Sequence, residues 1–384
     1  MISGTSMDGI DVAVADLQFV GDTVELRPLG ATTIEYPPEL RAALGDVLPP
    51  ATTTASEICR LDTFVGQTFA EVAQAAIERF AGGAVDLVVS HGQTVFHWVD
   101  SEGRARGGLQ LGQPAWIAEA TGAPVVADVR ARDIAAGGHG APLASTLDEL
   151  LLGGSAEVAG ALNLGGIANI TIVARGAPTM AFDIGPANAL IDAAVSEASG
   201  GAEAFDVDGT RARRGSVDTA LLERLLADPF YRRPPPKSTG KELFHAAYLF
   251  EHVAALGAID PDDIVATATA LTAITVADVC REFGVERLVA SGGGVDNPAL
   301  MERLGAELPN VVIATIDDYG IPAGAKEAYL FALIGFLTVH ELPGSVASAT
   351  GAAEPAVLGC LLPGRNGFPT ITRRTSPPTR LIIT

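Results

Sequence analysis

The stretch ALNLGGIANITIVARGAPTMAFDIGPAN at residues 161–188 carries the clearest fold signal in this chain. Residues 161–164 favour a strand, the two glycines that follow favour a turn, and residues 170–174 and 179–185 favour two more strands. A helical pattern begins past Pro186. Strands joined by such short turns, followed by a helix, indicate a compact supersecondary unit of an α/β domain.

The opening of the chain, MISGTSMDGIDVAVADL at 1–17, has the same order of polar turn and strand, with a second strand predicted over 23–29. The likeness predicts a duplicated unit, one copy in each of two lobes. Only residues 1–3 precede the first turn, so the first strand of the first lobe is nearly missing. Four or five buried apolar residues contribute about 5–10 kcal/mol. We therefore expect that this strand continues upstream of Met1, or that the chain is impaired.

The rest of the sequence alternates strand, polar turn and helix, which predicts a mostly parallel sheet with loops at its carboxyl ends. The predicted elements are a helix over 58–80, strands over 85–90 and 124–128, a helix over 262–283, a strand over 287–291, a helix from Pro298 and a strand over 310–314.

A chain of 384 residues is too long for one typical core, which again predicts two lobes. A Gly- and Pro-rich segment at 135–145 indicates the joint. We expect an N-terminal lobe over 1–133, completed by about 345–365, and a second lobe over 134–344. The tail at 366–384 carries Arg and Pro without periodicity and is predicted to be disordered.

The formal charge of −21 argues against nucleic acid or an anionic membrane as a partner, because both need a basic surface. Three cysteines, an odd number placed far apart, give no disulfide framework and fit a reducing compartment. The sequence also lacks the pattern of a signal peptide. We expect a cytoplasmic protein.

Several glycine-rich turns have the groups that hold a phosphate. GTSMDGID at 4–11 offers backbone N–H groups, hydroxyls and a carboxylate for Mg²⁺, although it is neither a Walker loop nor a dinucleotide fingerprint. LNLGGIAN at 162–169 offers the same backbone chemistry from the other lobe. SGGGVDN at 291–297 permits the close approach that an adenosine pocket requires. For each motif taken alone, a simple tight turn is the alternative.

A few side chains outside these turns are candidates for chemistry. Asp183 stands at a predicted strand end, where a carboxylate serves as a general base or caps the helix that follows. Arg130 lies in DVRARD and suits an anionic group. His91 and His97 are six residues apart, which suits no metal site on one helix face, so each is interpreted as structural. Lys237 suits either an anion or solvent.

Eight motifs occur in the order seen in anhydro-N-acetylmuramic acid kinases, which this chain resembles over about residues 3–363. They are GTSMDGID, HGQT, DVRARDIAAGGHGAPL, NLGGIANIT, DIGPAN, PKSTGKE, SGGGVDNP and the YGIP…AKEA segment. The resemblance implies the actin, sugar-kinase and heat-shock-chaperone ATPase superfamily. Its two ribonuclease-H-like lobes, with a cleft between them, match the predicted duplication.

The resemblance also implies a reaction. Water opens the 1,6-anhydro ring of the sugar while ATP phosphorylates O6, giving N-acetylmuramic acid 6-phosphate and ADP for peptidoglycan recycling. Asp183 matches the base that activates the water, Asp8 is assigned to Mg²⁺, and the sugar and ATP are the expected partners. A homodimer is left open. The sugar is assigned to Thr94, Arg130, Asn188 and Glu327, and ATP to Gly4, Thr5, Ser6, Met7, Asp8, Gly9, Ile10, Asp11, Gly165, Gly166, Asn169, Gly292, Gly293 and Gly294.

Three positions depart from the resembled family, which usually reads GGQGAP and DTGPGN where this chain has His139, Ile184 and Ala187. Hydrogen bonds from Gln and Thr side chains are then lost or replaced, which bears on sugar affinity more than on reaction type. Two alternatives stay open. One is a catalytically impaired nucleotide-binding paralogue or regulator, and the other is a kinase for another sugar.

Overall fold

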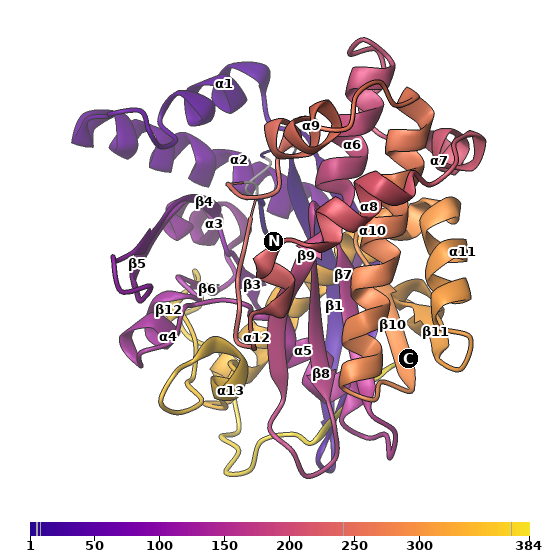
Figure 1. The fold of residues 1–384 in the computed structure, drawn as a ribbon. Helices are drawn as coiled ribbons and strands as arrows, with labels where there is room; N and C mark the ends of the chain where they lie inside the picture. The colour runs from indigo at the N-terminus through magenta and orange to yellow at the C-terminus, as the bar shows by residue number, and fades with distance from the viewer. Residues whose placement is uncertain (5–6, 8, 241, 370) are drawn as a thin grey trace. The chain divides into compact units, whose positions relative to one another are not determined.

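The computed structural model describes residues 1–4, 7, 9–240, 242–369 and 371–384. The chain divides into two compact units, of which unit 1 comprises Met1–Gly154 and Gly320–Thr384 and unit 2 comprises Ser155–Tyr319. Both units combine sheets with helices (Figure 1). The predicted α/β class is confirmed.

Unit 2 is built on one five-stranded sheet with the order β11-β10-β7-β8-β9. Its strands are β7 (Ala159–Leu164), β8 (Ile167–Val173), β9 (Met180–Pro186), β10 (Arg287–Ser291) and β11 (Val312–Thr315). β8 runs antiparallel to both β7 and β9, and β10 and β11 run parallel to β7. This is the strand arrangement of a ribonuclease-H-like lobe. The prediction of a mostly parallel sheet is wrong for β7 to β9, because short turns join only antiparallel strands.

The helices of unit 2 pack around α10, which is its central helix. They are α6 (Asn188–Ala198), α7 (Thr210–Arg214), α8 (Thr219–Leu226), α9 (Ala246–Ala254), α10 (Pro261–Glu282) and α11 (Pro298–Glu307), with 3-10 turns η1 (Val207–Gly209), η2 (Pro229–Arg232), η3 (Gly293–Asp296) and η4 (Ile316–Tyr319). Within the described residues, α10 alone is long and apolar enough to span a membrane, with a mean hydropathy of 1.5. Because 83% of that stretch is buried inside the protein, its apolar side chains are accounted for by the core of unit 2.

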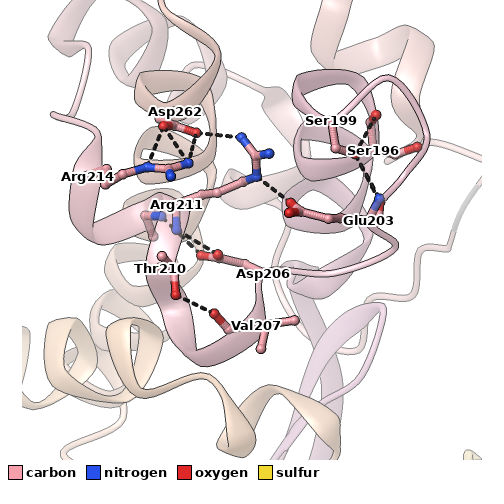
Figure 2. A network of polar contacts seen from close by, with 10 residues as sticks. Ser196, Ser199, Glu203, Asp206, Val207, Thr210, Arg211, Arg214 and Asp262 are labelled. Carbon is pink, nitrogen blue, oxygen red and sulfur yellow. Dashed lines mark hydrogen bonds and ion pairs between the residues drawn. The ribbon is translucent and has the colours of Figure 1, made fainter.

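The first turn of α10 is tied to α7 by a network of ion pairs, which Figure 2 shows. Asp262 accepts from Arg214 and from Arg211, each at 2.8 Å, and Arg211 also donates to Glu203 at 2.6 Å. Hydrogen bonds from Arg214 and then Arg211 lower the pKa of Asp262. The network fixes the segment after α6 against the core helix.

Unit 1 contains two three-stranded sheets and a separate hairpin. The first sheet has β1 (Ile10–Val20), β2 (Thr23–Ile34) and β13 (Arg380–Ile383), the second has β3 (Val88–Val89), β6 (Val125–Ala127) and β12 (Cys360–Leu362), and the hairpin has β4 (Gln93–Val99) and β5 (Ala105–Leu111). β1 pairs antiparallel with β2, and β3 pairs parallel with β6. The hairpin was not predicted.

Residues 1–3 link the two sheets of unit 1. Ile2 exchanges two backbone hydrogen bonds with Asp11 of β1, at 2.9 and 2.8 Å. On the other side, the N–H of His91 donates to the carbonyl oxygen of Met1 at 3.0 Å, and Ser3 bridges Gln93 in parallel. The order β2, β1, residues 1–3, β3, β6 therefore repeats the order β9, β8, β7, β10, β11 of unit 2. The predicted duplication is confirmed in strand order, with a first strand of only three residues in unit 1.

The helices of unit 1 pack on these strands and on one another. They are α1 (Pro38–Asp46), α2 (Ala55–Ala81), α3 (Pro114–Thr121), α4 (Ala131–Ala135), α5 (Ala144–Leu152), α12 (Lys326–Val339) and α13 (Ala347–Thr350), with the 3-10 turn η5 (Ala323–Ala325). Thr54 caps α2 by accepting from the N–H of Glu57, and Val65 and Phe69 of α2 are buried in the same core cluster as Val12 of β1.

The unit boundaries differ from those expected from sequence. Residues 134–154 and 320–344, which we expected in the second lobe, belong to unit 1, because α5 and α12 pack on each other and on its strands. The predicted disordered tail contains β13, which pairs parallel with β2. The segment expected as the joint is folded onto α4, where Asp133 accepts from the N–H of Gly140 at 2.8 Å.

Candidate active site

Two glycine turns and the start of α6 meet in unit 2, at the carboxyl ends of β7 and β10. A Cβ atom on Gly292 would lie 2.6 Å from Asn163 Oδ1 and 2.9 Å from the carbonyl oxygen of Leu164. A Cβ on Gly294 would lie 2.6 Å from the Cβ of Leu164 and 3.3 Å from Asn188 Oδ1. The structure therefore brings together Gly165, Gly166, Asn188 and the three glycines of the SGGG turn.

The turn between β7 and β8 is fastened to the start of α6 through its carbonyl groups. The N–H of Asn188 donates to Gly165 O at 3.0 Å, the N–H of Ala187 donates to Gly166 O at 2.9 Å, and Asn188 Nδ2 donates to Leu164 O at 3.1 Å. Among the described residues, no turn or loop hydrogen bond uses the N–H of either glycine. Both glycines are partly exposed, and backbone N–H groups that no protein acceptor uses can bind phosphate oxygens.

Gly293 differs from its two neighbours, because its surroundings are open. It is exposed, and a Cβ at this position would have no described atom of another element within 4 Å. Gly292, in contrast, has a φ of +83° and is closely packed. The backbone at Gly293 can therefore be approached closely by a ligand.

Asp183 lies on β9 opposite Asn169 of β8. Its Oδ2 accepts from the N–H of Thr239 at 2.8 Å and from the hydroxyl of Ser238 at 3.0 Å, while its own N–H donates to Lys237 O at 3.0 Å. Part of the PKSTGKE segment thus runs along the edge of β9 and holds the carboxylate in one orientation; Lys241 of that segment lies outside the described residues.

The interpretation of Asp183 as a helix cap is wrong, because the residue at the N-cap of α6 is Ala187 and no side chain caps that helix. Burial raises the pKa of Asp183, and the hydrogen bonds from Thr239 and Ser238 lower it by less. The charge of Lys237 lowers this pKa least, and its Nζ donates instead to the carbonyl oxygens of Tyr231 at 3.2 Å and Phe230 at 3.4 Å. Asp183 is therefore a partly exposed carboxylate whose raised pKa suits proton abstraction.

The three departures from the family pattern lie in different surroundings. Ile184 and Ala187 are 1% and 0% exposed, and both belong to the core cluster of unit 2. His139 is exposed and donates its backbone N–H to Thr350 O at 2.9 Å. Ile184 thus adds to the core, where a Thr side chain would need a hydrogen-bond partner.

In unit 1 the predicted phosphate loop follows the strand of residues 1–3. Met7 donates its N–H to Gly4 O at 3.2 Å, and the Ser3 hydroxyl donates to Gly9 O at 2.7 Å. Asp11 accepts from the Thr33 hydroxyl at 2.6 Å. Ile10, another predicted ATP contact, is fully buried at the start of β1. The remaining residues assigned to this loop, Thr5, Ser6 and Asp8, lie outside the described residues.

Gln93 supports this loop from a fully buried position. Its Nε2 donates to Gly4 O and to Thr94 O, each at 3.0 Å, and its Oε1 accepts from the Tyr36 hydroxyl at 3.2 Å. Thr94, a predicted sugar contact, is the next residue on β4 and is partly exposed. One amide side chain therefore joins a predicted phosphate-binding residue to a predicted sugar-binding residue.

Arg130 is oriented by two protein groups. Its Nε donates to His91 Nε2 at 2.7 Å, and its Nη1 donates to Gly140 O at 2.5 Å. Burial and the charge of Arg130 lower the pKa of His91 to about 3, so His91 is neutral. Its Nδ1 then donates to Gly92 O at 3.0 Å, which leaves Nε2 as the acceptor. The interpretation of His91 as structural agrees with this arrangement.

Glu327 is the second residue of α12. The protein packed around its carboxyl raises its pKa, and the charge of Arg130 opposes this effect. Arg130, Glu327 and Thr94 all belong to unit 1, whereas Asp183, Asn169 and Asn188 belong to unit 2.

Within the described residues, no group of three His, Cys, Asp or Glu side chains could hold a metal ion. Mg²⁺ is commonly held by one or two carboxylates together with substrate phosphates, so a dedicated protein cage is not required. The described carboxylate that suits this role is Asp11, at the end of the loop. The residue predicted as the ligand, Asp8, lies outside the described residues.

Sequence reasoning did not select Gln93 or Asp133 as site residues, and it named Ser238 and Thr239 only as part of PKSTGKE, without a role. Asp133 is fully buried and accepts from Gly140 N and from the Thr350 hydroxyl, each at 2.8 Å. Each of these residues lies within a motif of the sequence. Gln93 lies within HGQT, Asp133 within DVRARD, and Ser238 and Thr239 within PKSTGKE. A buried polar residue inside a motif is a candidate for holding the exposed residues beside it.

Comparisons with known proteins agree with the motifs. The model of the family described as anhydro-N-acetylmuramic acid kinase matches residues 1–364. A protein of that name from Streptomyces coelicolor (strain ATCC BAA-471 / A3(2) / M145) is 56% identical over 365 residues, covering 95% of this chain and 93% of that protein. Another from Streptomyces avermitilis is 54% identical over 384 residues, covering 100% and 98%. A ROK hexokinase structure from Thermus thermophilus is 18% identical with a TM-score of 0.32, covering 84% of this chain and 99% of that one.

Proposed function

Because the chain belongs to the anhydro-N-acetylmuramic acid kinase family, we propose that it converts 1,6-anhydro-N-acetylmuramic acid, water and ATP into N-acetylmuramic acid 6-phosphate and ADP. The bond from C1 to O6 breaks, water supplies the new C1 hydroxyl, and O6 takes the γ-phosphoryl group. The observation that carries this proposal is Asp183, a partly exposed carboxylate with a raised pKa, held in one orientation by Ser238 and Thr239.

In this proposal Asp183 removes the proton from the water that attacks C1. Asn169, which is assigned to ATP, lies opposite it on β8. The N–H groups of Gly165 and Gly166 and the open backbone at Gly293 bind the nucleotide, which the close packing of their turns supports. Mg²⁺ would neutralise phosphate charge beside Asp8 and Asp11 of the unit 1 loop. Mg²⁺ and a homodimer remain predictions.

The free state of Cys59, Cys280 and Cys360 supports a reducing compartment, and we place the reaction in the cytoplasm. Fractionation of cells that express the chain tests this placement, and recovery outside the cytoplasm would contradict it.

The test of the reaction is a coupled assay for ADP release. We expect ADP only when the anhydro sugar, ATP and Mg²⁺ are all present, and EDTA should abolish it. Mass spectrometry should find a product heavier than the sugar by one water and one phosphoryl group. Nucleotide binding without sugar-dependent ADP release would instead favour the impaired paralogue, and transfer to a simple amino sugar would favour another sugar kinase.

Arg130→Lys is expected to raise the KM for the sugar by about 10–100-fold, because a hydrogen bond to a charged group contributes about 1.5–3 kcal/mol. His91 and Gly140 hold two of the guanidinium nitrogens, which leaves the third for the anionic lactyl group of the sugar. The matched control is Arg132→Lys, an exposed neighbour on α4. An equal rise in the KM for ATP, or an equal effect of the control, would contradict the assignment.

A further inference from the structure

The carboxylate of Asp183 uses only one of its two oxygens in its contacts with the described residues. Oδ2 accepts from the N–H of Thr239 at 2.8 Å and from the hydroxyl of Ser238 at 3.0 Å, whereas Oδ1 accepts from no described residue. The side chain is partly exposed, and a carboxylate oxygen has about two lone-pair sites. Oδ1 can therefore accept from a ligand. In the proposed function, on which this inference rests, that ligand is the water that attacks C1.

The hydroxyl group of Thr239 lies close to this carboxylate. Its Oγ1 is buried and has no hydrogen-bond partner in the part of the chain that the structure describes. Covalent geometry and staggered rotamers keep Oγ1 of a threonine within about 4 Å of its own backbone nitrogen, which here is the atom bonded to Asp183 Oδ2. Buried polar atoms of native proteins are rarely left without a partner, because the loss of solvation costs stability. An unpartnered hydroxyl beside a general base indicates that its partner is a bound ligand.

The segment that carries Thr239 is fastened on two sides. The carbonyl oxygen of Lys237 accepts from the N–H of Asp183 at 3.0 Å, which ties the segment to the edge of β9. The Nζ of Lys237 donates to Tyr231 O at 3.2 Å and to Phe230 O at 3.4 Å, and it lies 4.8 Å from the ring centre of the fully buried Phe230. The same segment is thus also tied to η2. These contacts give the Thr239 hydroxyl a defined place relative to the carboxylate.

A water that attacks carbon is best oriented by two hydrogen-bond acceptors. One acceptor takes the proton, and the other holds the second hydrogen, so that a lone pair of the water faces the carbon atom. Asp183 Oδ1 suits the first role. The oxygen of a threonine hydroxyl has acceptor lone pairs and suits the second role, whereas a backbone N–H can only donate. The carboxylate and the hydroxyl together therefore have the two groups that such a water requires.

We propose that Thr239 is a second catalytic residue, whose hydroxyl oxygen accepts the hydrogen of the attacking water that Asp183 does not remove. One proton of the water passes to Asp183 Oδ1, and the water oxygen bonds to C1 as the bond from C1 to O6 breaks. O6 takes the γ-phosphoryl group of ATP, and ADP leaves. The second hydrogen stays on the new C1 hydroxyl, which donates to Thr239 Oγ1. The N–H of Thr239 thus holds the base, and its hydroxyl holds the water.

The test is Thr239→Val in the full chain, which removes the hydroxyl and keeps the branched shape and the backbone N–H. We expect kcat in the coupled ADP assay to fall by about 10–100-fold, while the KM values for the sugar and for ATP stay within about twofold. The Tm should be equal or higher, because a methyl group replaces a buried hydroxyl that has no described partner.

Two variants control for the loss of the threonine itself. Thr239→Ser keeps the hydroxyl and should retain most of kcat. Thr219→Val, an exposed position at the start of α8, should change neither kcat nor Tm. An unchanged kcat in Thr239→Val, or a lower Tm in place of a lower kcat, would overturn the proposal.

Two further measurements separate a role at the water from a role at the carboxylate. Thr239→Val keeps the N–H bond to Oδ2 and leaves the neighbouring charges of Glu242 and Lys237 in place, so the acid limb of kcat/KM should not move. In the background of Asp183→Asn, the same substitution should lower kcat by less than about threefold, because both residues act on one water and their effects do not add. A shifted acid limb, or an equal loss of kcat in both backgrounds, would contradict the proposal.

The unsubstituted chain shows which of the two proposals has failed. If it releases no ADP with the anhydro sugar, the proposed function fails and the role of Thr239 fails with it. If it turns over the sugar and Thr239→Val matches it, the proposed function stands and only the role of Thr239 is refuted.

Discussion

Asp183→Asn is expected to lower kcat by about 10²–10⁴-fold, the usual contribution of a general base, while the protein stays folded. An amide cannot take the proton of the attacking water. Its oxygen still accepts from the N–H of Thr239 and the hydroxyl of Ser238, so the edge of β9 keeps its hydrogen bonds. The coupled ADP assay measures kcat, and circular dichroism checks the fold. A variant that keeps near-normal turnover would refute the assignment.

The pH profile of the unsubstituted enzyme is part of the same prediction. The base must be ionised, so kcat/KM falls as the pH falls through the pKa of Asp183, which lies above the ordinary value. Ser238→Ala is the matched control, because it removes one hydrogen bond that lowers this pKa and leaves the carboxylate in place. We expect the acid limb to move to higher pH with a small change in the plateau. If the acid limb of the kcat/KM profile is the same in Ser238→Ala, the ionisation of Asp183 does not determine that limb.

Much of unit 2 could be predicted from sequence, because its local signals agree with its packing. The glycines after Leu164, the strand over 287–291 and the helix near Pro298 occur where predicted, and β10 matches in both bounds. Asp183 and the glycine turns were selected because small residues and a carboxylate at strand ends are visible in a sequence. The direction of β7 to β9 was predicted wrongly. The prediction of a mostly parallel sheet followed the alternation of strands and helices along the chain and did not use the short turns that join these three strands.

Unit 1 was harder to predict, because its parts are distant in the chain. β13 pairs with β2 across more than 350 positions, and no local pattern in a Pro-rich tail indicates that pairing. The same holds for Asp133, whose partner Thr350 lies 217 residues away. Gln93 acts through buried hydrogen bonds to Gly4 and Tyr36, which only the folded structure reveals.

Substitution of Gly292 by Ala is expected to destabilise unit 2 by about 2–6 kcal/mol, because two costs add. The φ of +83° is unfavourable for a residue with a Cβ, at about 1–3 kcal/mol. The Cβ would also lie 2.6 Å from Asn163 Oδ1 and 2.9 Å from backbone atoms of Leu164, and such overpacking costs about 1–3 kcal/mol. Urea unfolding of the full chain measures this loss.

The neighbouring variant Gly293→Ala separates stability from nucleotide binding. Its Cβ would have no described atom of another element within 4 Å, and its φ is not in the left-handed range, so the unfolding free energy should change by less than about 1 kcal/mol. If the nucleotide approaches this turn as closely as we propose, the added Cβ meets the ligand and raises the KM for ATP by about tenfold or more. An unchanged KM for ATP in Gly293→Ala would mean that the SGGG turn is not part of the nucleotide site. A loss of stability in Gly292→Ala would not alter that conclusion, because the unfolding free energy of that variant tests only the packing of the turn against β7.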